Sequence, residues 1–127
     1  MKSGLIYSIV CKSVSEAGDV DYSLNIDRVM GRLTVGSFPY TLSKDDFIVH
    51  QTYFDLDCNI HTGQILFTHS ETGQILGKLN IQIDFTNGVR QSVGYAPPPV
   101  VIYEKTTILV QTFFDENLVA VYPLQID

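Results

Sequence analysis

Oxygen-bearing side chains alternate along the segment from Asp55 to His61, which reads Asp-Leu-Asp-Cys-Asn-Ile-His. Its first half resembles the start of a calcium loop, where oxygens at alternate positions converge on one hard cation. Ile60 then occupies the position that needs glycine, and Leu66 the position of the closing glutamate. We therefore predict no metal and no other cofactor. The segment is interpreted as a polar strand end whose Asp and Asn side chains bond their own backbone. It forms one candidate binding cluster, made of Asp55, Asp57, Asn59 and His61.

The histidines and cysteines give no catalytic or zinc signature. His50, His61 and His69 lack the spacing of a zinc site, although His61 would approach His69 if the Thr62–Leu66 segment doubled back as a hairpin. No Gly-x-Ser-x-Gly elbow and no phosphate-binding loop are present. Cys11 lies in an apolar run and is predicted to be a small buried hydrophobe. We predict that the protein is not an enzyme.

The second candidate binding segment is Gly94-Tyr95-Ala96-Pro97-Pro98-Pro99. Three consecutive prolines favour an extended, stiff backbone without internal hydrogen bonds. The favoured interpretation is a crossover from one sheet to another, because proline is excluded from central strands. The functional alternative is a rigid contact loop, in which an aromatic ring is ordered at little entropic cost. Its residues are Tyr95, Pro97, Pro98 and Pro99.

Alternation of apolar and polar residues predicts the strands that must position these side chains. Val20–Ile26 and Ile75–Phe85 each alternate with period two, which is typical of strands with one buried and one solvated face. Asn87-Gly88 predicts a hairpin after Phe85. Further turns are predicted at Ala17–Asp19, Val29–Gly31 and Asp115–Asn117, and a short helical turn at Ser43–Asp46.

Two other patterns concern the middle and the end of the chain. The pentapeptide Thr-Gly-Gln-Ile-Leu occurs at residues 62–66 and again at 72–76, and each Thr-Gly is predicted to lie where a turn enters a strand. Residues 102–114 and 118–126 carry aliphatic side chains on both faces. Such strands lie in the centre of a packed sheet or bury a face against a partner, so a homo-oligomer formed through the C-terminal strands is one prediction.

The chain is predicted to be a single all-β domain spanning residues 1–127, an antiparallel β-sandwich of eight or nine strands. A closed eight-stranded antiparallel barrel is the alternative. The composition of 45% hydrophobic and 17% charged residues supports a substantial core. The net charge of −6 lacks the basic field that nucleic-acid binding needs. No membrane span and no signal peptide are recognised, so a cytoplasmic protein with reduced cysteines is expected.

Three functional hypotheses remain open after these exclusions. The first is a non-catalytic interaction module that recognises a protein or a carbohydrate (glycan) through loops or a sheet edge. The second is a carrier of small apolar ligands, which requires the cavity of a barrel. The third is a leaderless defence or toxin protein, which the composition neither supports nor excludes. The sequence favours the first because it contains few charges, no catalytic motif, and tyrosine and proline residues with an exposed character.

Overall fold

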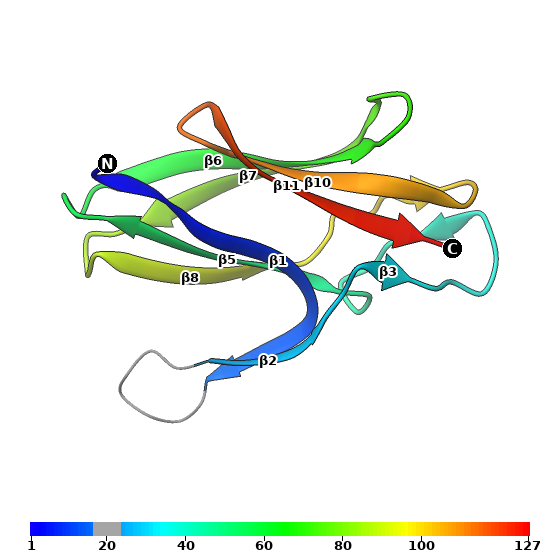
Figure 1. Ribbon diagram of the computed structural model, residues 1–127, viewed down its shortest axis with the longest axis horizontal. Helices are drawn as coiled ribbons and strands as arrows, with labels where there is room; N and C mark the ends of the chain where they lie inside the picture. The colour runs from blue at the N-terminus through cyan, green and yellow to red at the C-terminus, as the bar shows by residue number, and fades with distance from the viewer. Residues whose placement is uncertain (17–23) are drawn as a thin grey trace.

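The computed structural model describes residues 1–16 and 24–127 as strands joined by turns and loops, with no helix in those ranges. Two sheets lie face to face as separate layers (Figure 1). The first sheet has the order β2-β1-β5-β8, formed by β1 (Ser3–Glu16), β2 (Leu24–Val29), β5 (Ile48–Asp55) and β8 (Arg90–Tyr95). The second has the order β3-β11-β10-β6-β7, formed by β3 (Arg32–Leu33), β6 (Ile60–His69), β7 (Ile75–Asp84), β10 (Thr106–Phe114) and β11 (Asn117–Ile126).

These layers confirm the predicted β-sandwich. A small third sheet pairs β4 (Tyr40–Thr41) with β9 (Val101–Ile102). Apart from the parallel contact between β3 and β11, the strand pairs found in the described ranges are antiparallel. The barrel alternative is wrong for this part of the chain, because the two large sheets stay separate. The described residues also contain no helix long and apolar enough to cross a membrane.

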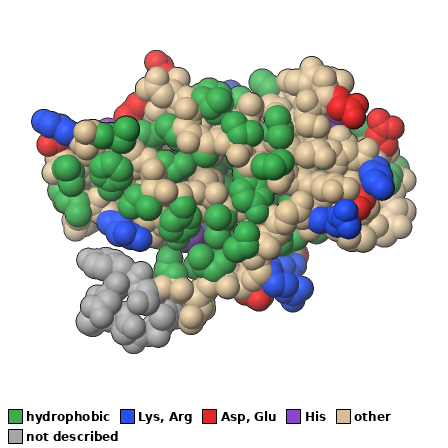
Figure 2. Space-filling view, in the orientation of Figure 1, with side chains coloured by type: hydrophobic (Ala, Val, Ile, Leu, Met, Phe, Trp, Pro, Cys, Tyr) green, Lys and Arg blue, Asp and Glu red, His purple; other side chains and the backbone are tan. Residues whose placement is uncertain are grey.

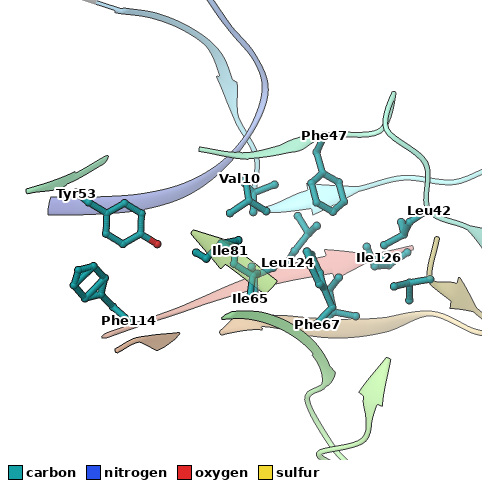
Figure 3. Packing of buried hydrophobic residues seen from close by; sticks show 14 of the residues in the cluster. Val10, Leu42, Phe47, Tyr53, Ile65, Phe67, Ile81, Phe114, Leu124 and Ile126 are labelled. Carbon is teal, nitrogen blue, oxygen red and sulfur yellow. The ribbon is translucent and has the colours of Figure 1, made fainter. Parts of the chain in front are cut away.

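The core lies between the inner faces of the two sheets (Figure 3). At one end, Phe67 of β6 lies beside Leu124 and Ile126 of β11, with Phe47 above them. At the other end, the rings of Tyr53 and Phe114 stack with centroids 5.3 Å apart. Alternate burial along β10 follows from this arrangement, because every second side chain of a strand points to the same face.

The predicted strand at Ile75–Phe85 is confirmed, whereas the hairpin after it is wrong. Ile81 and Ile83 point into the core, while the polar residues that alternate with them, Asn80, Gln82 and Asp84, are exposed. Gly88 N–H does donate to the carbonyl of Phe85 over 3.0 Å, so a tight turn forms. The next strand, β8, joins the opposite sheet and does not pair with β7. A local turn signal fixes the reversal of the chain but not the sheet that the next strand joins.

Of the other predicted turns considered next, two are confirmed and one is wrong. The turn predicted at Asp115–Asn117 is confirmed between β10 and β11, with Asp115 and Glu116 as its two residues outside the strands. Thr72–Gly73 lies in the β6–β7 turn as predicted, with Gly73 at a φ of 73°. Thr62–Gly63, in contrast, lies inside β6. Here glycine is needed for close approach, because a Cβ at Gly63 would lie 2.4 Å from the carbonyl oxygen of Phe113.

Two further segments differ from the predictions. Ser43–Asp46 forms a single turn closed by Asp46 N–H to the Ser43 carbonyl at 3.1 Å, and not a helix. Only part of the Val20–Ile26 strand can be compared, since residues 17–23, with the turn predicted at Ala17–Asp19, lie outside the described residues. Its observed part opens β2, where Ile26 is 39% exposed, so the buried face predicted there is not formed.

Candidate functional site

The Asp55 carboxylate organises the connection between β5 and β6. Its Oδ1 accepts the backbone N–H of Asp57 at 3.0 Å, and its Oδ2 accepts that of Asn59 at 2.7 Å. The predicted bonding of an Asp side chain to its own backbone is thus confirmed. The loop also requires a φ of 53° at Cys58. The side chains of Asp57 and Asn59 point to the surface, while Asp55 is 1% exposed.

The first strand residues after this loop bring His61 against Asp55. His61 Nε2 lies 2.9 Å from Asp55 Oδ2, and His61 Nδ1 lies 2.6 Å from Asp115 Oδ2. The imidazole stacks on Phe114 with the ring centroids 4.8 Å apart. It lies in a T-shaped arrangement with Phe85, with the centroids 5.8 Å apart. We call Asp55, His61 and Asp115 the His61 cluster. Asp115 reaches the cluster from 54 residues along the chain, because β10 pairs with β6.

The charges of the His61 cluster stabilise one another. Burial disfavours the imidazolium, but the bonds to Asp115 and Asp55 outweigh this effect and raise the pKa of His61. Burial likewise opposes ionisation of Asp55, yet the N–H groups of Asn59 and Asp57, together with His61, hold the pKa of this carboxyl below its usual value. Both ring nitrogens of His61 are within hydrogen-bond distance of a carboxylate. Neither nitrogen is therefore free to activate a nucleophile or to bind an external ligand.

The described residues contain no group of three His, Cys, Asp or Glu side chains arranged to hold a metal ion. The predicted approach of His61 to His69 is wrong, because both lie on β6, eight residues or about 26 Å apart along the strand. His69 Nδ1 instead accepts the N–H of Glu71 at 3.2 Å. His50 is buried on β5 and bonds the hydroxyl of Tyr7 at 3.0 Å.

The proline segment follows β8 and packs against β7, which are edge strands of the two large sheets, opposite β2 and β3 in the strand orders. It leads from β8 in the four-stranded sheet to β9 and on to β10 in the five-stranded one, which confirms the crossover interpretation. Pro97 is buried, Pro98 is half-buried and Pro99 is exposed. A Cβ at Gly77 would lie 2.9 Å from Pro98 Cγ, so β7 and this proline are closely packed. Burial raises the pKa of Tyr95. The contact role of Tyr95, Pro97, Pro98 and Pro99 remains a prediction, and of these four residues only Pro99 is exposed.

A groove on the outer face of β6 and β7 was not predicted from the sequence. It has a volume of about 650 Å³. The polar side chains that line it belong to Thr62, Gln64, Asn80 and Gln82, and Phe113 and Glu116 border it from the β10–β11 hairpin. We call it the β6–β7 groove. The only signal in the sequence was the polar face of the 75–85 strand, whose partner on β6 could not be known.

Strand register explains why these side chains meet. Gln64 lies opposite Asn80, and its Nε2 donates to Asn80 Oδ1 at 3.2 Å. Thr62 lies opposite Gln82 in the next row, and Phe113 of β10 lies opposite Gln64. The side chains therefore project from three hydrogen-bonded strands, which position them more firmly than a loop does.

The C-terminal hairpin also exposes an apolar surface. Leu118 is 51%, Val119 40% and Val121 48% exposed, and β11 contains no charged residue. Figure 2 shows hydrophobic side chains across the middle of the face over β1 and β11, with most charged side chains nearer the periphery. β10 is a central strand, as one of the two sequence interpretations required.

Comparison with protein-family models finds no match for this chain, and neither does comparison with curated proteins. Its function must therefore be argued from the groove, the His61 cluster and the apolar hairpin.

Proposed function

We propose that this protein is a non-catalytic binding module whose β6–β7 groove recognises a carbohydrate. The observation that carries the proposal is the lining of the groove, where amide and hydroxyl side chains on paired strands lie next to the ring of Phe113. Amide groups both donate and accept hydrogen bonds, as sugar hydroxyls do. The ring offers an apolar surface to the C–H face of a sugar.

The charge of the groove supports binding over catalysis. Of the described residues that line it, only Glu116 carries a carboxylate. Glycoside hydrolysis ordinarily uses two carboxyl groups that flank the scissile bond. A protein partner is less favoured, because the centre of a protein interface is typically apolar, whereas Gln64, Asn80 and Gln82 are among the residues that line this groove.

The test is an array of immobilised oligosaccharides, followed by calorimetric titration of the bound sugar. Gln82→Ala is expected to weaken binding about tenfold, equivalent to about 1.4 kcal/mol, through loss of a hydrogen-bonding amide. Gln74→Ala is the matched control, because Gln74 is exposed in the β6–β7 turn outside the groove lining. A blank array, or a loss caused by Gln74→Ala and not by Gln82→Ala, would contradict the proposal.

A second candidate function is self-association through β11, which the apolar hairpin surface favours. Between the hairpin turn and its contact with β3 at Gln125, β11 is bonded to β10 on one side. Charged residues commonly protect such edges from pairing, and β11 contains none.

Val121→Lys is expected to convert a dimer to a monomer, since it introduces a charge at a half-exposed position of that edge. Light scattering after size exclusion measures the effect. Val89→Lys, at a similarly exposed valine before β8, is the control. A wild-type protein that is monomeric at a concentration of about 10⁻⁴ M would contradict self-association. A stable dimer has a dissociation constant below that concentration.

A further inference from the structure

The turn that borders the β6–β7 groove has an unfavourable backbone. Asp115 and Glu116 have φ values of 48° and 69°, in the left-handed region that glycine and asparagine adopt most readily. Two-residue hairpin turns of this kind usually contain Asn-Gly or Asp-Gly. Glutamate at the second position must therefore be held by contacts elsewhere in the structure.

Those contacts come from β6 and, through it, from β5. Asp115 N–H donates to the carbonyl of Thr62 at 2.9 Å, and the Asp115 carboxylate lies 2.6 Å from His61 Nδ1. The imidazole is fixed in turn by Asp55 at 2.9 Å and by its stack on Phe114. Asp55 itself is fixed by the two backbone N–H groups of its loop.

The protonation state of His61 decides whether both of its bonds can form. A carboxylate only accepts hydrogen bonds, so both ring nitrogens must carry a proton to serve Asp55 and Asp115 together. A neutral imidazole has a single N–H and leaves one contact unmade. Asp55 is buried and held by two N–H donors, whereas the Asp115 side chain is 43% exposed, so Asp115 is the partner that is released.

The remaining charged groups near the cluster are also mostly acidic. Asp84 of β7 lies opposite Ile60, and Asp57 of the β5–β6 loop lies 3.8 Å from Lys2 at the start of β1. Glu116 follows Asp115 in the turn, and Cys58 lies in the loop. Asp115 and Asp55 are the carboxylates that raise the pKa of His61, and Lys2, the nearby cation, is paired with Asp57.

We propose that His61 is a positioning residue for the β6–β7 groove: as an imidazolium it holds Asp115, and this contact fixes the turn that places Glu116 and Phe113 at the groove. Loss of the proton releases the turn. This inference rests on the proposed function for its purpose, but the movement itself requires no ligand.

The direction of the pH dependence follows from the geometry. His61 is fully charged below the ordinary histidine pKa of about 6.5, and it stays charged above that value because its folded-state pKa is raised. While Asp115 is ionised, the turn is therefore held at pH values at which His61 is charged, and it is released as the pH rises through the folded-state pKa. Carbohydrate affinity is expected to fall over the same range.

The test is an NMR titration of the ligand-free protein. The His61 Cε1–H shift gives its midpoint, and the ¹⁵N–{¹H} NOE of Glu116 reports motion of the turn at pH 6 and pH 8.5. The expected result is a midpoint above about 6.5 and a Glu116 NOE that falls at pH 8.5. Asp115→Asn, which suits the left-handed region, should lower the His61 midpoint and make the Glu116 NOE independent of pH.

His69→Gln is the control, because His69 lies at the far end of β6 and should leave the Glu116 response unchanged. The inference is overturned if the Glu116 NOE is the same at both pH values while His61 titrates, or if Asp115→Asn leaves the pH response intact. A blank oligosaccharide array would refute the proposed function alone, since this titration contains no ligand.

Discussion

Replacing Phe67 with alanine is expected to lower the free energy of unfolding by about 3–5 kcal/mol, measured by urea denaturation. Phe67 has no exposed surface and lies where the two sheets meet, beside Leu124 and Ile126 and below Phe47 (Figure 3). Its neighbours on both adjacent strands are small or rigid, with Gly77 on β7 and Val110 on β10. None of them can fill the space that the ring leaves, so a cavity remains.

Ile60→Ala is the control for this prediction. Ile60 is on the same strand but is 52% exposed, so its truncation should change the free energy of unfolding by no more than about 0.5 kcal/mol. Equal costs for the two variants would mean that the interior near Phe67 collapses around the missing ring, contrary to the packing described.

The sequence predicts burial correctly in the second half of β7. Lys78, Asn80 and Gln82 are exposed and Ile81 and Ile83 are buried, as period-two alternation requires. The hairpin at Asn87-Gly88 fails because pairing is not a local property. The turn forms, yet packing of β8 against β5 in the opposite layer decides where the chain goes next.

The candidate site shows the same limit. The bonds from Asp55 to its own loop involve neighbours in the sequence and were predictable. Asp115 was predicted only as part of a turn, and its contact with His61 depends on the register between β6 and β10. The β6–β7 groove likewise requires Gln64 opposite Asn80, which no periodicity reveals. A shift of one residue would turn these side chains to the other face of the sheet.

The two-faced C-terminal strands predicted a central position or an interface, and the structure confirms the central position for β10. β10 is central and buries Ile108 and Val110. β11 lies next to the short β3 and leaves Leu118 and Val121 exposed. Hydrophobic content alone cannot distinguish a buried strand from an exposed one. A valine that faces solvent and a valine that faces a second sheet are the same letter in the sequence.

Gln51→Ala is expected to cost about 4 kcal/mol of unfolding free energy, an effect comparable to that of Phe67→Ala. Gln51 is fully buried on β5. Its Nε2 donates to Ser8 Oγ at 3.0 Å and to Thr112 Oγ1 at 2.8 Å, and its Oε1 accepts the hydroxyl of Tyr53 at 2.5 Å. Because Thr112 belongs to the five-stranded sheet and the others to the four-stranded one, Gln51 joins the two layers.

The cost arises from the partners that are left behind. In the described residues, no buried side-chain nitrogen or oxygen lacks a hydrogen-bond partner. Truncating Gln51 would leave the Tyr53 hydroxyl buried without its acceptor, and each such group costs about 1–3 kcal/mol in addition to the cavity. Burial raises the pKa of Tyr53, so its hydroxyl remains a donor through the neutral range and the penalty is independent of pH there.

A double-mutant cycle separates the hydrogen bond from the cavity. Gln51→Leu keeps most of the volume but still leaves the Tyr53 hydroxyl without its acceptor, whereas Gln51→Leu with Tyr53→Phe removes both polar partners. The double variant should therefore be more stable than Gln51→Leu alone by about 1 kcal/mol, although it contains one more substitution. If Tyr53→Phe destabilises the Gln51→Leu protein instead, the Tyr53 hydroxyl has another acceptor in solution and does not depend on Gln51 as the geometry indicates.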